Sequence, residues 1–212
     1  MSTVFGYDRG TPIDRIYVDA FLNDNASHIR GRTLEVVDDH YTLKYGAHRT
    51  TKRDVVDFRA DNPKATIVGD LCHLGTDWDG SFDAIVLTQT LQLIYDLPEA
   101  VRAFWSLLDV EGTILLTVPG LTPIDRGQDY STWYWAFTET SALRLFSEVF
   151  GAENVEVSVF GNVFTAVSFL HGLAAEELAP DKLFIRDPHL PVTIGIRATK
   201  SRKVASINSE GD

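Results

Sequence analysis

The stretch FDAIVLTQTLQLIYDLPEAVRAFWSLLDVEGTILLTVPG, residues 82–120, decides the fold of this chain. Residues 82–89 form a nearly continuous apolar run, which is typical of a parallel strand covered on both faces. Residues 98–112 place apolar side chains on one helical face and end at Gly112, a plausible stop. Residues 113–120 are a second apolar run closed by Pro-Gly. Strand, helix and strand in this order predict a βαβ unit with a right-handed crossover.

Further elements are predicted on both sides of this unit. An amphipathic helix over about 11–24, with Thr11 as N-cap and Pro12 at its first position, comes first. A later helix takes Thr140 or Ser141 as its cap. Seven strands with helices between most of them predict a doubly wound, mostly parallel α/β sheet with helices on both faces. The remaining predicted ranges are strands at 33–38, 52–58, 65–70, 154–161 and 190–200, and helices at 138–151 and 162–178.

Composition limits the classes of function. The 212 residues suit a single domain over 1–200 with a flexible tail at 201–212. Thirty acidic against 19 basic residues give a formal charge of −11, which repels nucleic-acid phosphates. Cys72 is the only cysteine, so no disulfide forms within the chain. With no apolar run near the roughly 20 residues of a membrane span and no basic, apolar leader, we expect a cytoplasmic monomer or homodimer that binds neither nucleic acid nor membrane.

Five phrases in this order resemble class I S-adenosylmethionine-dependent methyltransferases of the type 11-like, small-molecule kind. The resemblance extends over roughly residues 32–160, and the predicted helix at 11–24 looks like a lid over the cofactor. It implies a seven-stranded Rossmann-like sheet, S-adenosyl-L-methionine as cofactor, and methyl transfer to an oxygen, nitrogen or carbon of a small molecule or saccharide. The phrases are LEVVDDHYT (34–42), ATIVGDL (65–71), FDAIVLTQTLQLIYD (82–96), LLDVEGTILLTVPG (107–120) and YWAFTETSALRLFSEVF (134–150).

The resemblance also implies cofactor-binding positions at the carboxyl ends of the strands. Asp57 would accept hydrogen bonds from both ribose hydroxyls, with Asp61 as the alternative carrier of that role. Asp70 would accept a hydrogen bond from the adenine amino group, and Leu71 would offer its backbone N–H to the ring. The other interpretation is that Asp57 is a solvated turn carboxylate and that Asp70 caps a helix or turn.

The loop after the first predicted strand lacks glycine at positions 37, 39 and 41, where Val, Asp and Tyr stand instead. Glycine permits a positive φ and a close approach to a ligand, which Val37 and Tyr41 do not freely allow. Carboxylates at Glu35, Asp38 or Asp39 suit the ammonium and sulfonium of the cofactor by electrostatic attraction. We therefore expect the cofactor to bind at Glu35 and Val37 on an unusual loop path, with loss of binding as the alternative.

Catalytic candidates follow from the chemistry of methyl transfer. Thr88 and Gln89 end the fourth strand, where the resemblance places residues beside the methionine part and the transferred methyl. A base is needed only if the acceptor must lose a proton during attack. His40, beside the cofactor loop, is the first candidate base and Tyr17 on the lid helix is the second. The alternative for His40 is a purely structural role.

Acceptor-binding candidates lie near the same edge of the predicted sheet. Trp133 and Trp135 follow the fifth strand and would form the walls of an acceptor pocket, or else cover the core. Arg9, Asp14 and Arg15 near the lid would hold a polar acceptor, or else be solvated charges on a helix. No zinc-hydrolase, nucleophile-elbow or phosphate-loop motif occurs, and DDH at 38–40 is not taken as a metal site. Two rival functions stay open: a non-catalytic partner domain in a biosynthetic pathway, and a cofactor-binding enzyme of another type, such as a cyclase.

Overall fold

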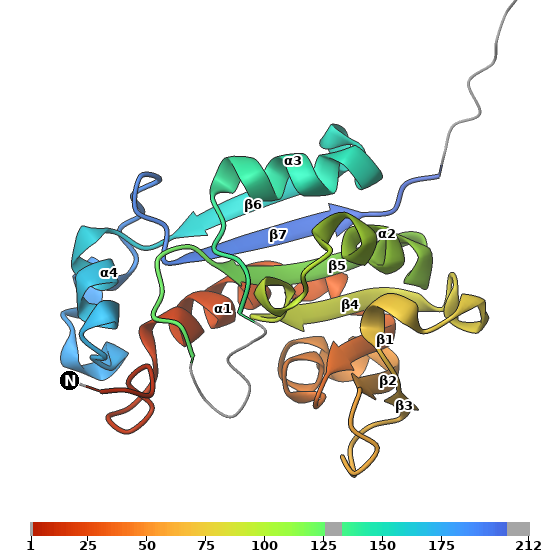
Figure 1. Cartoon of the computed structure of the whole chain (residues 1–212), viewed down its shortest axis with the longest axis horizontal. Coiled ribbons are helices and arrows are strands. Elements are labelled where there is room, and N and C mark those ends of the chain that lie inside the picture. Colours follow the sequence, from red (N-terminus) through yellow and green to blue (C-terminus); the bar gives the residue numbers. More distant parts are fainter. Residues whose placement is uncertain (1, 126–132, 203–212) are drawn as a thin grey trace, which may run out of the picture.

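A single sheet organises the molecule. The computed structural model describes residues 2–125 and 133–202, and within them seven strands pair in the order β3-β2-β1-β4-β5-β7-β6 (Figure 1). β7 is antiparallel to both of its neighbours, while the other paired strands run parallel. The predicted doubly wound, mostly parallel sheet is confirmed. The strands are β1 (Gly31–Val36), β2 (Thr50–Asp57), β3 (Ile67–Val68), β4 (Phe82–Thr88), β5 (Leu108–Pro119), β6 (Val155–Phe160) and β7 (Thr193–Thr199).

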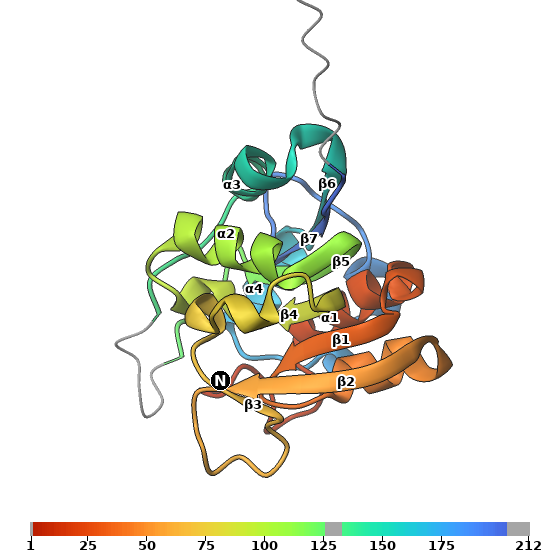
Figure 2. The ribbon, with the colours of Figure 1, turned by 90° about the vertical axis from the view of Figure 1, so that its right-hand side faces the viewer.

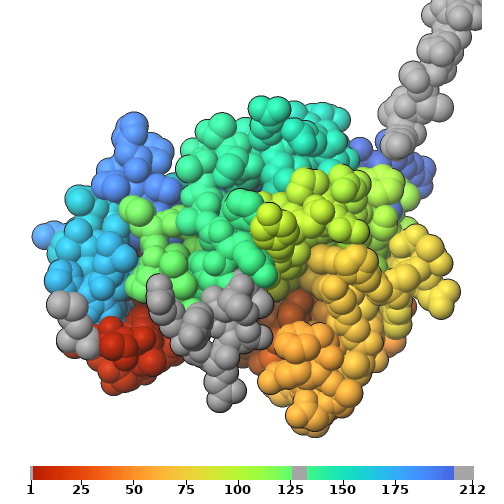
Figure 3. All heavy atoms as spheres, viewed as in Figure 1, coloured from red at the N-terminus to blue at the C-terminus, as the bar shows by residue number. Residues whose placement is uncertain are grey.

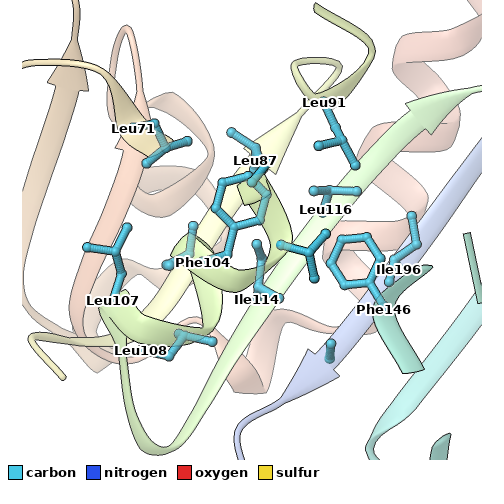
Figure 4. Packing of buried hydrophobic residues seen from close by; sticks show 14 of the residues in the cluster. Leu71, Leu87, Leu91, Phe104, Leu107, Leu108, Ile114, Leu116, Phe146 and Ile196 are labelled. Carbon is cyan, nitrogen blue, oxygen red and sulfur yellow. The ribbon is translucent and has the colours of Figure 1, made fainter. Parts of the chain in front are cut away.

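Helices cover both faces of this sheet (Figures 1 and 2). α2 (Leu97–Leu107) and α3 (Glu139–Phe150) pack on one face, and α1 (Ile13–Asp24), α4 (Val163–Leu170) and α5 (Pro180–Leu183) contribute to the core on the other. Successive residues of β4 explain its continuous apolar run, because Ile85 and Leu87 face the first layer and Val86 the second. Figure 4 shows Leu87 packed with Phe104 of α2 in the first layer. Among the described residues, no helix is long and apolar enough to cross a membrane.

The starts of α1 and α3 differ from the predicted caps by one to three residues. α1 begins at Ile13 with Pro12 as its N-cap, and Thr11 instead donates from its hydroxyl to Glu176 at 2.6 Å. α3 is capped by Thr138 in a capping box with Ser141, so the predicted caps Thr140 and Ser141 were wrong by two or three residues. Any Ser or Thr in the run TETS has the chemistry of a cap, and only the tertiary contacts choose one.

Two predicted helix ends were also wrong. α2 stops at Leu107, because β5 starts at Leu108 and already contains Gly112. The predicted helix at 162–178 ends at Leu170, where Gly172 (φ +70°) turns the chain against Ser2. A Cβ on Gly172 would lie 2.6 Å from the Ser2 Cβ, so this turn also requires glycine for its close contact. The predicted tail at 201–212 lies outside the described residues from position 203 onward.

α1 is a packing helix rather than a lid. Its residues Tyr17, Val18 and Phe21 are buried against the sheet. Phe21 lies so close to Gly195 of β7 that a Cβ there would be 2.4 Å from the ring. Only the first turn of α1, with Asp14 and Arg15, reaches the carboxyl edge of the sheet. The expected lid over residues 11–24 is therefore corrected to a helix fixed on one sheet face.

Candidate functional site

Two left-handed residues mark the point where the strand order reverses, between β1 and β4. Val37 follows β1 with a φ of 72°, and Gln89 follows β4 with a φ of 48°. The Val37 N–H donates to the Val56 carbonyl at 3.0 Å, and its carbonyl accepts from the Asn62 side chain at 2.7 Å. A β-branched residue rarely adopts this conformation, so its neighbours hold it there against strain. The loop thus takes the backbone conformation that glycine takes freely, although glycine is absent.

Replacing Val37 by Gly is expected to raise the free energy of unfolding by about 0.5–1 kcal/mol, because relief of left-handed strain exceeds the added chain entropy of glycine. Val68→Gly is the matched control, since Val68 is similarly exposed but lies in β3 and has no positive φ. Urea unfolding measures both variants. A Val37→Gly variant that loses as much stability as Val68→Gly would contradict this account of the loop.

Glu35 serves the chain's own backbone. It is only 4% exposed, and its carboxylate oxygens accept hydrogen bonds from the backbone N–H groups of Tyr41 (3.0 Å) and Thr42 (2.7 Å). Burial raises the pKa of Glu35 to about 7, against the opposing effect of these two bonds. Its carboxylate holds the helical turn Thr42–Gly46 in place. Both oxygens of Glu35 are therefore engaged by the backbone, so this carboxylate is not free to attract the cofactor's cations as expected.

Two further acids of this edge are paired with basic side chains of the chain itself. Asp38 pairs with Lys64 at 3.7 Å, and Asp39 pairs with Arg53 at 3.1 Å. The expected attraction between this acidic loop and a cation is therefore weakened, because each carboxylate already has a partner within the chain.

Asp57, at the end of β2, is 2% exposed and accepts three hydrogen bonds from its own loop. They come from the Arg59 backbone (3.0 Å), the Arg59 guanidinium (3.3 Å) and the Asn62 amide (2.8 Å). Burial by itself would raise the pKa of Asp57, but these bonds outweigh it and hold the pKa below its usual value. The Arg59 side chain is 55% exposed and is the partner most easily displaced by a ligand.

Asp70 lies where the alternative interpretation put it, as the cap of a turn. One Asp70 oxygen accepts from the Cys72 backbone N–H at 2.9 Å, and the other lies 2.9 Å from Nδ1 of His73. Asp70 thus caps the short turn Leu71–His73, while the Leu71 side chain belongs to the core on the α2 side. A contact from Asp70 to adenine would compete with this cap.

A cavity of about 390 Å³ opens beyond the carboxyl ends of β4 and β5. Figure 3 shows the red N-terminal segment next to the green segment that follows β5, and both segments contribute to the lining of this cavity. Four buried side-chain atoms on residues lining the cavity have no hydrogen-bond partner in the described structure: Asp14 Oδ1, Arg15 Nε, Gln89 Nε2 and Gln92 Oε1. Native proteins pair nearly all such atoms, so this group is suited to a polar ligand. The lining comes from segments 3–7, 14–15, 89–93 and 122–125 and from Trp133.

Asp14 and Arg15 form the charged part of this lining. Burial raises the pKa of the Asp14 carboxyl, and the Arg15 guanidinium, 3.6 Å away, partly opposes that rise. Burial raises the pKa of the Tyr41 hydroxyl, and the nearby Arg15 guanidinium partly opposes that rise. A buried carboxyl with a raised pKa beside a cavity has the properties of a general base.

The remaining predicted residues divide between the cavity and the core. Trp133 lines the cavity together with Arg15 and Gln89. Trp135 instead donates from its indole to the Ile94 carbonyl at 3.0 Å and packs on the core. His40 is exposed, its backbone donates to Asp38, and its ring lies 5.0 Å from that of Tyr41. The Thr88 carbonyl accepts from the Thr90 hydroxyl at 3.0 Å.

Tyr17 lies away from the cavity. Its side chain is fully buried, and its hydroxyl donates to the Leu183 carbonyl at 2.7 Å. Burial raises the pKa of this phenol, and the ring stacks on Phe160 at 5.8 Å. A phenol in this position has no route to an acceptor, so Tyr17 is corrected from candidate base to core residue.

Removing the Tyr17 hydroxyl is expected to cost about 1 kcal/mol of stability, which is the typical contribution of one buried hydrogen bond. Thermal unfolding of Tyr17→Phe measures this effect. A Tyr17→Phe variant as stable as the wild type would contradict the placement of this hydroxyl in the core.

Sequence reasoning did not assign Gln92, and it named Asp14 beside Arg15 only as a possible holder of a polar acceptor, not as a base. Gln92 is 1% exposed, and the visible signal was a polar side chain inside the otherwise apolar run LQLIY. Asp14 was visible as an acid in the first turn of a helix, where charge normally complements the helix dipole. Neither signal points to a cavity until α1 and the loop after β4 meet.

No protein-family model and no curated protein sequence matches this chain. Solved structures match its fold. A S-adenosylmethionine-dependent methyltransferase from Archaeoglobus fulgidus superposes with a TM-score of 0.58 over 88% of this chain and 94% of its own, at 15% identity. A putative S-adenosylmethionine-dependent methyltransferase from Listeria monocytogenes gives a TM-score of 0.56 over 90% and 97%, at 10% identity. The [4+2]-cyclase SpnF gives 0.57 over 91% and 83%, at 15% identity.

These similarities define a class of fold. The chain has the fold of class I S-adenosylmethionine-dependent methyltransferases, with seven strands in the order given above and β7 reversed. At such low identity the likeness shows the fold alone, and the cyclase illustrates that the same scaffold occurs with another reaction.

Proposed function

We propose that this protein is an S-adenosylmethionine-dependent methyltransferase that acts on a small polar acceptor. The single observation that carries the proposal is the group of unpaired polar atoms on Asp14, Arg15, Gln89 and Gln92 around one cavity. The cavity lies at the carboxyl edge of the sheet, where ligands of open α/β folds bind. Likeness in fold to methyltransferases supports the same class of reaction.

The residues present fit the cofactor at the strand-order reversal. The left-handed backbones at Val37 and Gln89 let the main chain curve beside a ligand. Asp57 would hold the ribose hydroxyls once the exposed Arg59 guanidinium moves aside. When bound, the cofactor supplies an electrophilic methyl group on a sulfonium. The chain's own part is to hold the acceptor in line for attack and to keep water out.

Asp14 replaces His40 as the proposed base. Its Oδ1 is buried, unpaired and on the cavity wall, whereas His40 is exposed and outside the cavity lining. An acceptor that loses a proton on attack would pass it to Oδ1 of Asp14. The Arg15 guanidinium favours the ionised form of Asp14 and so opposes the rise that burial gives its pKa.

Calorimetric titration with S-adenosylmethionine and with its demethylated product tests the proposal. Saturable heat with either ligand is the expected result, and no heat with a thermal shift of zero at millimolar ligand would overturn it. The mass of the product separates the rival reactions, since a methyltransferase adds one methyl group and a cyclase adds none.

The ribose contact has its own pair of variants. Asp57→Asn is expected to weaken cofactor binding by about 1–2 kcal/mol, as for a hydrogen bond to a charged group. Asp61→Asn, an exposed carboxylate on the same loop, should leave the affinity unchanged. If the two variants exchange these effects in the titration, the ribose role belongs to Asp61.

A further inference from the structure

The cavity presents unpaired donors and unpaired acceptors together. Arg15 Nε and Gln89 Nε2 are donors without a hydrogen-bond partner, and Asp14 Oδ1 and Gln92 Oε1 are acceptors without one, although Arg15 Nε lies 3.6 Å from Oδ2 of Asp14. They come from α1 and from the loop after β4, so no single turn explains the group. A ligand that satisfies the cavity must therefore both give and receive hydrogen bonds.

Gln92 is the most firmly positioned of these residues. Its side chain is 1% exposed, and its amide nitrogen donates to the Gln89 carbonyl at 2.9 Å. Its backbone carbonyl accepts from the N–H groups of Tyr134 at 2.9 Å and Trp135 at 3.3 Å. These bonds hold Gln92 in place. Its Oε1 stays an acceptor without a hydrogen bond, which a donor group of a ligand would supply.

Functional groups differ in how well they meet this pattern. A carboxylate only accepts hydrogen bonds and would leave Asp14 and Gln92 unpaired. An ammonium only donates and would leave Arg15 and Gln89 unpaired. A hydroxyl does both, and several hydroxyls on one ring would satisfy both kinds of atom at once.

The shape of the cavity points the same way. Asp14 and Arg15 lie 3.6 Å apart and partly offset each other's charge, and Asp125 also lines the cavity. Trp133 and Tyr7 add aromatic surface to the lining, on which the apolar face of a sugar ring can rest.

We infer that this cavity binds a neutral, polyhydroxylated acceptor, a sugar or a cyclic polyol, through Asp14, Arg15, Gln89 and Gln92. The inference rests on the proposed function for the claim that this ligand is the methyl acceptor. Binding itself does not depend on the cofactor.

Saturation-transfer NMR on the whole protein, without cofactor, tests the inference. The probes are methyl α-D-glucopyranoside, methyl α-D-galactopyranoside and myo-inositol, compared with butyrate as an acceptor-only ligand and butylammonium as a donor-only ligand. We expect saturable transfer from at least one polyol, with tighter binding than either ion shows. Butyrate or butylammonium binding more tightly than every polyol, or no saturable transfer from any polyol up to high millimolar concentration, would overturn the inference.

Variants connect the signal to the cavity. Gln92→Leu and Arg15→Met remove one orphaned group each from different elements, and each should weaken polyol binding by about tenfold, equivalent to one typical hydrogen bond. Thr90→Val is the control, because Thr90 lies in the same loop but is outside the cavity lining. Unchanged polyol affinity in both Gln92→Leu and Arg15→Met would place the binding elsewhere and overturn the assignment. The NMR experiment contains no cofactor, so the two claims can fail separately. Binding of polyols without any heat from S-adenosylmethionine would support this inference and contradict the proposed function.

Discussion

Asp14→Asn is expected to slow methyl transfer to a hydroxyl acceptor by about a hundredfold or more, which is the usual contribution of a general base. Asparagine keeps the size of the side chain and its Oδ1 acceptor, so the acceptor should still bind, while the proton on the attacking hydroxyl has no destination. The Asp14 carboxyl is suited to this role because burial raises its pKa and its Oδ1 has no partner in the described structure. Steady-state kinetics should therefore show a reduced kcat with little change in the KM for the acceptor.

The pH profile distinguishes a base from a structural carboxyl. A base works only when ionised, so wild-type activity should fall as the pH drops through the raised pKa of Asp14, and Asp14→Asn should lack that fall. Asp19→Asn is the matched control on the same helix, where Asp19 is about one-third exposed and binds Lys44 and Tyr45 at 2.8 and 2.6 Å. A slow Asp14→Asn variant that keeps the wild-type pH profile would assign Asp14 a positioning role only.

The layered fold was predictable because a strand that is buried on both faces has apolar residues at successive positions. In β4 and β5 every residue from Ile85 to Leu87 and from Ile114 to Leu116 contacts one helix layer or the other, so the apolar runs are unbroken. Helix ends were less predictable. TETS offers several capping hydroxyls, and the choice of Thr138 depends on how α3 packs, which no local pattern encodes.

The candidate site was predictable in place but not in its internal bonding. The sequence located the carboxyl edge of the sheet, and Gln89, Arg15 and Trp133 do meet there. It could not show that Asp39 and Asp57 are already paired with Arg53 and Arg59, because such pairing depends on the path of the loops. The sequence shows that an acidic residue is present, but only the folded structure shows whether its carboxylate is free to contact a ligand.

The loop after β1 also could not be predicted from residue types, because it contains Val37 where a glycine was expected. Val37 looked incompatible with a tight turn, yet its N–H and carbonyl are bonded to Val56 and Asn62 and hold its φ at 72°. Two hydrogen bonds from neighbouring segments can outweigh a conformational cost of about 1–2 kcal/mol. Residue type alone therefore predicts the cost of a turn, and the tertiary structure decides whether the turn forms.

Glu35 is expected to make the protein less stable as the pH rises from about 4.5 to 7. In the unfolded chain its carboxyl ionises near 4.5, whereas in the folded protein the pKa is about 7. A folded-state pKa above the unfolded value gives a contribution that is fully present below the unfolded pKa and lost as the pH rises through the folded one. The difference of roughly 2.5 pKa units corresponds to about 3 kcal/mol of unfolding free energy.

Comparison with Glu35→Gln isolates this contribution. Glutamine does not titrate, so the unfolding free energy of the wild type minus that of the variant should fall by about 3 kcal/mol across this pH window. Groups such as His73, whose pKa is raised by Asp70 and Glu99, titrate equally in both proteins and cancel in the difference. Glu148→Gln, at an exposed position on α3, is the matched control for the loss of a surface carboxylate. A flat difference for Glu35→Gln, in urea unfolding at closely spaced pH values, would mean that the bonds from Tyr41 and Thr42 keep Glu35 ionised in the folded protein and that burial does not prevail.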